Sequence, residues 1–189
     1  MQTHTPLQTA SFAHPVRNVG ALGIEAGMTV ADFGSGSGAY ALAIADRLAN
    51  GHIYAIDVQR DLLRRTHTEA HKRGHKNLSV IWADLEKPGA SKLADHKLDL
   101  VLISNLLFQL EDKSAPLLEA WRILKPTGNL GVIDWSDSFA GMGPVKKDVV
   151  TKGTAIALAQ KAGFDLTREF VAGAHHYGLI FRLVPKQNV

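Results

Sequence analysis

The 189-residue chain contains no cysteine. That absence excludes disulfide bridges, thiolate metal sites and a cysteine nucleophile, and we predict no metal site. Cytoplasmic residence fits a chain without disulfides, and it is the location we expect. No stretch approaches the roughly 18 uncharged apolar residues of a membrane-spanning helix. Residues 1–12 also lack the basic-then-apolar order of a signal peptide, so we expect no insertion into a membrane.

The sequence has no internal repeat, no low-complexity segment and no recognisable linker. With 46% hydrophobic and 21% charged residues, its composition is that of an ordinary globular protein. We therefore predict one domain over residues 1–189, with a flexible segment at 1–12 and a helix over 12–22 that could cover a pocket. The formal charge of +3 permits an acidic partner without requiring one.

Short apolar runs alternate with helical patterns along most of the chain. Strands are predicted at 28–33, 53–57, 78–83, 98–104 and 129–135, and helices at 38–49, 59–74, 112–124 and 149–162. Little room for a helix exists at 85–97. This alternation indicates a doubly wound α/β sheet. Residues 165–172 and 176–184 instead form an alternating pair around a Gly-Ala turn, which predicts an antiparallel hairpin.

The segment 30–38 reads as a buried strand, a glycine-rich loop and the start of a helix. Its three glycines permit positive φ angles and close approach of a ligand. Such turns usually bind phosphate, but Asp32 beside the loop disfavours an anion as the only ligand. A carboxylate there favours a cationic or hydrogen-bond-donating group with a ribose behind it, as in S-adenosylmethionine (SAM).

Acidic or amide side chains follow each predicted parallel strand. Because right-handed crossovers bring the carboxyl ends of parallel strands to one edge, we expect these side chains to meet there. The set is Asp32, Asp57, Asp84, Asn105 and Asp134. Two alternatives stay open: the glycine loop with Asp57 also fits a dinucleotide-binding fingerprint, and strand-end aspartates can simply cap nearby loop N–H groups.

Taken together, these motifs closely resemble the class I SAM-dependent methyltransferases over about residues 12–183. The resemblance implies a seven-stranded sheet, mostly parallel with an antiparallel C-terminal strand and helices on both faces. It implies that 32–38 backs the methionine part of SAM, that Asp57 accepts from the ribose hydroxyls, and that 83–85 reads the adenine. Segment 103–107 would lie beside the sulfonium and the acceptor, and 120–128 matches the helix and turn before the fifth strand.

The cofactor is accordingly SAM, and its product S-adenosylhomocysteine. The predicted cofactor-binding residues are Asp32, Gly34, Ser35, Gly36, Gly38, Asp57, Val58, Ala83, Asp84, Leu85, Ser104 and Asn105. The nearest subgroup in appearance is the small-molecule type related to quinone-biosynthesis methyltransferases.

Catalytic candidates are fewer, because methyl transfer needs alignment more than acid–base chemistry. A base is required only if the acceptor is protonated at working pH. The candidates on the expected rim are His14, Asn105, Asp134, His176 and Tyr177, with His175 beside them. Each also has a structural interpretation, namely the start of a helix, a loop cap or hairpin packing.

The predicted function is methyl transfer to a small, apolar or aromatic acceptor by in-line displacement. Phe108-Gln109 stands where the subgroup often carries histidine, which argues against a base there. Arsenite is disfavoured by the absence of cysteine, and the amino groups of adenine or glutamine by the sequence Asn105-Leu106-Leu107.

Two other hypotheses stay open. The first is a macromolecular substrate, RNA or protein, suggested by the basic helix at 59–74. The second is a SAM-binding sensor or accessory subunit without turnover. The regions that would enclose an acceptor, 1–22 and 136–149, are short, so a partner subunit could complete the cavity.

Overall fold

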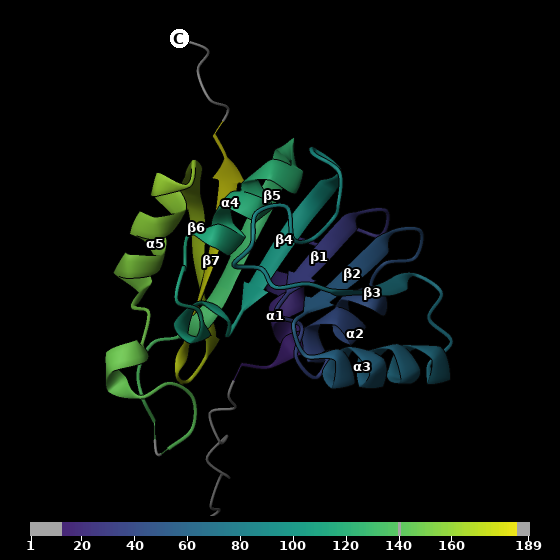
Figure 1. Ribbon diagram of the computed structural model, residues 1–189, viewed down its shortest axis with the longest axis horizontal. Helices are drawn as coiled ribbons and strands as arrows, with labels where there is room; N and C mark the ends of the chain where they lie inside the picture. The colour runs from purple at the N-terminus through teal and green to yellow at the C-terminus, as the bar shows by residue number, and fades with distance from the viewer. Residues whose placement is uncertain (1–12, 140, 185–189) are drawn as a thin grey trace, which may run out of the picture.

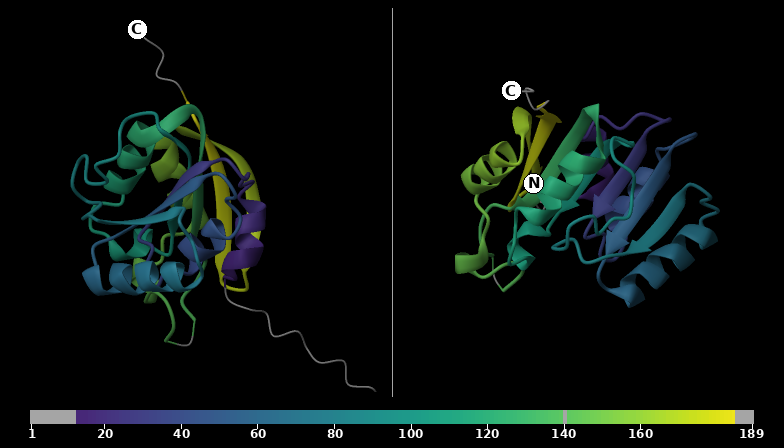
Figure 2. Two further views of the ribbon diagram at one scale, coloured as in Figure 1. Left: turned by 90° about the vertical axis from the view of Figure 1, so that its right-hand side faces the viewer. Right: turned by 45° about the horizontal axis from the view of Figure 1, so that its top comes forward.

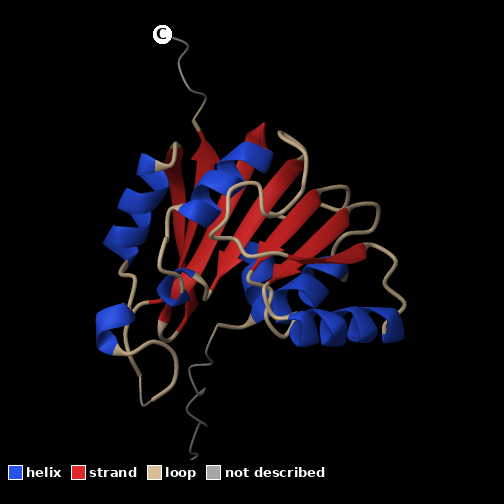
Figure 3. Ribbon diagram, viewed as in Figure 1, coloured by secondary structure: helices blue, strands red, loops and turns tan. Residues whose placement is uncertain are grey.

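A computed structural model describes residues 13–139 and 141–184. The helices are α1 (Pro15–Ala21), α2 (Ala39–Ala45), α3 (Arg60–Lys72), α4 (Ala115–Ile123) and α5 (Lys152–Lys161), with 3₁₀ turns η1 (Leu107–Gln109) and η2 (Lys146–Asp148). The strands are β1 (Thr29–Phe33), β2 (His52–Asp57), β3 (Leu78–Trp82), β4 (Leu98–Ser104), β5 (Leu124–Trp135), β6 (Phe164–Gly173) and β7 (His176–Leu183). Together they form one sheet flanked by helices (Figure 1, Figure 3).

The strand order is β3-β2-β1-β4-β5-β7-β6. The pairs from β3 through to β5 are parallel, and β7 runs antiparallel to both β5 and β6. The predicted α/β class, seven-stranded mixed sheet and antiparallel C-terminal strand are therefore confirmed. The direction in which successive strands are added to the sheet reverses at β1, because β2 and β4 lie on opposite sides of it. Ligands of open α/β sheets bind at such a switch point.

Each face of the sheet has its own apolar core. Strand side chains alternate between faces, so Phe33, Ile103 and Phe181 pack with α4 and α5, whereas Val30 and Leu102 pack with α1 and α2. The two groups of helices cover opposite faces (Figure 2). Asp32 shares the face of Val30, and its carboxylate is thereby directed toward α1 and α2 at the edge of the sheet.

The β3–β4 connection, residues 83–97, contains no helix, as the sequence predicts. Its anchor is the buried Glu119 on α4, which accepts hydrogen bonds from the N–H and the hydroxyl of Ser91 and from Arg122 Nη2 at 2.7 Å. Arg122 also donates to the carbonyl of Leu93. One charged network thus fixes a long loop that lacks regular structure of its own.

Two boundaries differ most from the sequence prediction. Residues 125–128, expected as a turn after the fourth helix, lie inside β5, where they bulge out between the pairs Leu98–Leu124 and Leu100–Asn129. Pro126 has no N–H for the ladder, which favours such an irregularity. The other difference is α2, which ends at Ala45, earlier than the expected residue 49.

Replacing Glu119 with alanine should lower the free energy of unfolding by about 2–3 kcal/mol, because Arg122 and Ser91 lose their common acceptor. Burial opposes the charged form, but the hydrogen bonds from Arg122 and Ser91 outweigh it and lower the pKa of Glu119. Its contribution is therefore complete above its unfolded pKa and lost as pH falls. Urea unfolding at pH 7 and pH 4 measures both effects.

The matched control is Glu69→Ala, which removes an exposed helix-surface pair with Arg73. We expect that variant to unfold at nearly the wild-type urea concentration. Equal losses in the two variants would show that the Glu119 network does not anchor the loop.

Candidate active site

Two cavities meet at the carboxyl edge of β1 to β4. The acidic cavity, about 340 Å³, is lined by Gly34, Gly36, Asp57, Val58, Gln59, Ala83, Asp84, Leu85, Glu86, Leu106, Gln109 and Leu110. The Asp32 cavity, about 280 Å³, is lined by Ala13, Pro15, Asp32, Gly34, Ser35, Gly36, Ser37, Ala39, Tyr40, Ser104, Asn105 and Gln109. Gly34, Gly36 and Gln109 line both, so the two cavities are continuous parts of one site.

The glycine loop separates the floors of the two cavities. Gly34, Gly36 and Gly38 have φ angles of 70°, 50° and 80°, a conformation that favours glycine. A Cβ at Gly34 would approach Leu106 Cδ1 to 2.8 Å, and one at Gly38 would collide with Thr66. A Cβ at Gly36 would meet nothing closer than 3.9 Å, so this glycine leaves room for a ligand.

Asp32 is buried, and neither of its carboxylate oxygens has a hydrogen-bond partner among the described residues. Burial, with a smaller contribution from the charge of Asp57, raises the pKa of Asp32 to about 8, and the N–H of Ala41 opposes the shift. Three more buried acceptor or hydroxyl atoms beside this cavity lack a described partner: Ser35 Oγ, Ser104 Oγ and Asn105 Oδ1. Since buried polar groups are rarely left unpaired, this cluster indicates a polar ligand.

Asp57 ends β2, and its two oxygens accept the N–H groups of Gly36 at 2.8 Å and Gln59 at 2.7 Å. The carboxylate therefore caps both neighbouring loops, as the structural interpretation of these aspartates expects. Capping does not use the whole hydrogen-bond-accepting capacity of Asp57, because each carboxylate oxygen has a second lone pair. Asp57 can hold the glycine loop and accept from a ligand at the same time.

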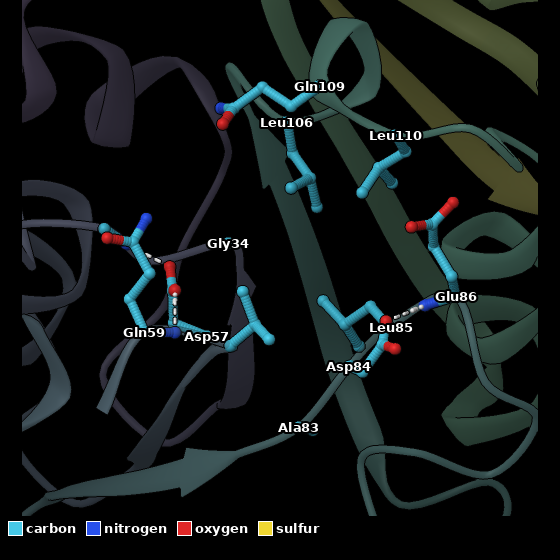
Figure 4. A pocket seen from close by; sticks show the side chains of 12 residues that line it. Gly34, Asp57, Gln59, Ala83, Asp84, Leu85, Glu86, Leu106, Gln109 and Leu110 are labelled. Carbon is cyan, nitrogen blue, oxygen red and sulfur yellow. Dashed lines mark hydrogen bonds between the residues drawn. The ribbon is translucent and has the colours of Figure 1, made fainter.

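Three loops wall the acidic cavity (Figure 4). Asp57 and Gln59 face it from the β2–α3 loop, Leu106, Gln109 and Leu110 from the segment after β4, and Ala83 to Glu86 from the segment after β3. The lining therefore combines carboxylates with apolar side chains, which suits a ligand with a flat ring and several donors.

Backbone N–H groups hold the carboxylates of Asp84 and Glu86 in the wall of the acidic cavity that follows β3. Asp84 accepts from Glu86 N at 3.1 Å, and Glu86 in turn accepts from Asp112 N at 2.7 Å. The bond to Asp112 closes the cavity between the β3–β4 connection and the segment before α4.

Helix α1 borders the Asp32 cavity through Ala13 and Pro15. It is fixed by the buried Asn18, whose Nδ2 donates to Tyr40 Oη and to the carbonyl of Ala172, each at 2.9 Å. His14 itself is exposed, and its side chain neither caps α1 nor lines either cavity.

Asp134 and Tyr177 lie on the α4–α5 face of the sheet, opposite to Asp32. Asp134 accepts from the N–H of Trp135 at 2.8 Å, and the Tyr177 hydroxyl donates to the carbonyl of Val150 at 2.9 Å. Burial raises the pKa of Asp134 to about 7 and also raises the pKa of Tyr177. Neither residue lines the two cavities, and their hydrogen bonds are those of loop supports.

His176 stacks on Trp135 with ring centroids 4.2 Å apart. Burial, followed by the proximity of His175, lowers the pKa of His176 to about 4, against the attraction of Asp137. His175 pairs with Asp137 at 2.8 Å and stacks on Phe139. These histidines lie at the same end of the sheet as the cavities but do not line them.

Every predicted cofactor residue except Gly38 thus lines one or both of the two cavities. Gly38 belongs to the glycine loop but lines neither cavity. Of the catalytic candidates, only Asn105 lines a cavity. Its φ of 51° is left-handed, its N–H donates to the carbonyl of Ile133 at 2.8 Å, and its carbonyl accepts from Gln109 Nε2 at 2.6 Å.

Sequence reasoning missed several lining residues, namely Ala39, Tyr40, Gln59, Glu86, Gln109 and Leu110. Ser37 and Leu106 lie in segments predicted to border SAM, and Ala13 and Pro15 lie in the segment predicted to cover a pocket, but none of the four was among the predicted cofactor residues. The position after each strand-end residue was the available signal, since loops that follow parallel strands form the rim of such sites.

Fold and site together define a class I SAM-dependent methyltransferase domain. The sheet has this order with an antiparallel seventh strand, and a glycine loop, an unpartnered acid and two further strand-end acids converge at its switch point. Comparison with known sequences agrees: the family described as "Methyltransferase domain" matches residues 24–176, and the chain belongs to it.

Three relatives illustrate the similarity. An arsenite methyltransferase of Aquipseudomonas alcaligenes is 34% identical over 110 residues, which are 55% of this chain and 32% of the relative. The ubiquinone/menaquinone biosynthesis C-methyltransferase of Shewanella oneidensis is 29% identical over 116 residues, 60% of this chain and 45% of the relative. The chain spans less than half the length of either curated relative.

The third relative is a solved structure. A SAM-dependent methyltransferase from Aquifex aeolicus has a TM-score of 0.81 and 27% identity, covering 90% of this chain and 89% of that one.

The described residues were also considered for a metal site and for a membrane-spanning helix. Within residues 13–139 and 141–184, no three His, Asp or Glu side chains are grouped so that they could hold a metal ion. Over the same ranges, every helix is too short or too polar to cross a membrane.

Replacing Asp32 with asparagine should stabilise the ligand-free protein at pH 8, by on the order of 1–3 kcal/mol. The folded state keeps a proton on Asp32 that the unfolded state loses above about pH 4. The contribution of Asp32 to the stability of the wild type therefore falls as pH rises from about 4 to 8. Asp134, with its raised pKa, acts in the same direction, so the informative quantity is the difference between wild type and variant.

Urea midpoints from pH 5 to pH 8.5 measure that difference. We expect the variant's advantage to grow with pH across this window. An advantage independent of pH would contradict the assignment of the raised pKa to Asp32.

Proposed function

We propose that this protein transfers the methyl group of SAM to a small acceptor. The observation that carries the proposal is the unpartnered, buried Asp32 in a cavity of about 280 Å³ that is continuous with a second cavity lined by two further strand-end acids. A ligand with a cationic amino group, a ribose and a base matches that order of groups. SAM supplies an activated methyl group on its sulfonium.

The residues present fit this ligand. Asp32 would pair with the ammonium of the methionine part, and Ser35 and Ser104 offer hydroxyls beside it. Asp57 would accept from the ribose hydroxyls, and Asp84 from the adenine amine. Each assignment uses an acceptor oxygen with unused capacity in the protein itself.

The ring of the base would lie between apolar side chains. Val58, Leu85, Leu106 and Leu110 line the acidic cavity from its separate walls. Val58 is 56% exposed, a high value for a valine, and a bound ring would cover it. Burying that surface contributes favourably in proportion to the apolar area removed from water.

The chain's own residues act mainly by alignment and exclusion of water. Gln109 lines both cavities where they meet, and Asn105, Ala13 and Pro15 line the Asp32 cavity beside it. The carboxylates of Asp32, Asp57, Asp84 and Glu86 each line only one of the two cavities, and Gln109, the one described side chain that lines both, cannot act as a base. This arrangement supports chemistry in which the acceptor attacks without prior deprotonation by the protein.

A macromolecular acceptor receives less support. Helix α3 carries the basic residues that suggested RNA, but Arg64 pairs with Asp61, Arg73 pairs with Glu69, and Arg60 stacks over Trp82 at 4.0 Å. These cations already have partners in the protein. Binding to RNA that weakens steeply with added salt would nevertheless favour this alternative.

Calorimetry with SAM and S-adenosylhomocysteine tests the proposal directly, and absence of binding at high micromolar ligand would reject it. Asp57→Ala should weaken SAM binding about 100-fold, because the ribose loses its acceptor and the glycine loop loses its cap. Asp57→Asn, which keeps one acceptor oxygen, should lie between that variant and wild type. Affinity unchanged in Asp57→Ala would refute the ribose assignment.

Binding of SAM should release a proton from Asp32. The ammonium favours the charged carboxylate, whereas in the free protein Asp32 holds its proton up to about pH 8. Affinity should therefore rise with pH between 6 and 8, by at most about tenfold per pH unit. Calorimetry at pH 7 in two buffers of different ionisation enthalpy counts the released proton, and Asp32→Asn should release none from this position.

Catalytic turnover distinguishes an enzyme from a SAM-binding sensor. Formation of S-adenosylhomocysteine with any member of a broad acceptor panel would exclude the sensor, whereas tight binding without turnover would support it.

A further inference from the structure

Gln109 has a place in the site that no other side chain shares. Three residues line both cavities, and the other two, Gly34 and Gly36, have no side chain. If the adenosine part occupies the acidic cavity and the amino-acid part the Asp32 cavity, the sulfonium lies where the cavities meet. Gln109 is then the side chain at the reacting methyl group.

The orientation of its carboxamide follows from one hydrogen bond. The carbonyl oxygen of Asn105 can only accept, so the group 2.6 Å from it must be Nε2 of Gln109. Oε1 is thereby turned away from Asn105, and no described residue donates to it. Gln109 lies on the same wall of the site as Leu106 and Leu110 (Figure 4). The exposed side chain thus offers the junction a hydrogen-bond acceptor whose orientation is set by the bond to Asn105.

The charge of the site restricts what can occupy it. Asp57, Asp84 and Glu86 line one cavity and Asp32 the other, and no Lys, Arg or His is found among the described lining residues of either. Even with the single positive charge of SAM the site stays negative. An anionic acceptor, such as a phenolate or a carboxylate, is disfavoured there by like-charge repulsion.

A neutral hydroxyl is also a poor fit, because it becomes a good methyl acceptor only after a base removes its proton. A neutral amine needs no such base. It becomes positively charged as it reacts, which a negative site stabilises, and its N–H can donate to a nearby acceptor oxygen.

Resting on the proposed function, we propose that the acceptor is a neutral amine whose N–H donates to Oε1 of Gln109. The nitrogen lone pair forms a bond to the methyl carbon while the carbon–sulfur bond breaks and leaves its electron pair on sulfur. The product is a methylated ammonium, which gives its extra proton to water. Gln109 holds the nitrogen in line and stabilises the charge that develops on it.

The test uses the full-length chain and matched acceptors on one aromatic and one aliphatic frame, each as amine, alcohol, thiol and carboxylic acid. Formation of S-adenosylhomocysteine is measured at saturating SAM. We expect amines to react at least tenfold faster than the matched alcohols and acids. An amine of low pKa should show a rate nearly independent of pH between 7 and 9.

Gln109→Leu removes the acceptor oxygen while keeping a side chain of similar size. We expect amine turnover to fall at least 30-fold, whereas SAM affinity changes less than threefold. Calorimetry measures binding of the amine to protein loaded with S-adenosylhomocysteine. In Gln109→Leu this affinity should weaken at least tenfold, which gives a readout independent of turnover. Gln109→Glu keeps an oxygen acceptor and should retain more amine binding than the leucine variant.

The matched control is Gln160→Leu on the exposed side of α5, remote from both cavities, which should behave as wild type. Faster reaction of alcohols, thiols or acids, no reaction of any amine, or full amine binding and turnover in Gln109→Leu would each overturn the inference. If wild type binds SAM in those cases, the proposed function stands and only the acceptor assignment fails. If SAM itself does not bind, the proposed function fails first.

Discussion

The carboxylate of Asp32 is the constraint on which the site depends. The end of β1 places it on the inner face of the sheet, out of contact with water and without a donor from the described protein. Folding therefore leaves a buried acid unsatisfied, which costs stability and keeps the group protonated near neutral pH. The partner that this buried acid lacks within the described protein is one that a cationic or hydrogen-bond-donating ligand can supply.

Two further contacts shape the loops around Asp32. The bond from Gly36 N to Asp57 links the loops after β1 and β2 and so holds Asp57 against the glycine loop. The left-handed backbone at Asn105 turns the chain sharply after β4 and brings Gln109 over the junction. The first of these bonds joins the ends of two neighbouring parallel strands, and the second orders the segment that follows β4.

The fold was predictable because the hydrophobic periodicity of the sequence indicates where its helices and strands lie. The nearly apolar run 98–104 indicated a strand covered on both faces, and β4 is such a strand. The start of β5 was not predictable, since Lys125-Pro-Thr-Gly128 has the composition of a turn and only its pairing across β4 makes it a bulge. Local sequence reports turn chemistry, whereas register depends on a neighbouring strand.

The site was predictable to the extent that strand ends determine it. Asp32, Asp57 and Asp84 lie at or just after the carboxyl ends of β1, β2 and β3, and the parallel sheet gathers them. Asp134, His176 and Tyr177 lie at the same edge, but the face to which a strand directs each side chain decides whether it reaches a cavity, whereas His14 precedes α1 and is exposed. Asp134 is one residue out of phase with Ile133 and so points to the opposite face, which periodicity alone could have signalled.

The attachment of α1 has a consequence for how the protein is made. Asn18 and Arg17 bond to the carbonyl of Ala172, and Arg168 bonds to the carbonyl of Ala21, so the helix bordering the Asp32 cavity is held by β6. Helix α1 can therefore be fixed in place only after β6, which comes much later in the sequence, has formed. During synthesis from the N-terminus, the glycine loop and its acids emerge first, but the wall of the cavity is completed only when the last hairpin has been released. A copy truncated before β6 and β7 would hold the sequence motifs but lack the contacts that fix the wall of the Asp32 cavity.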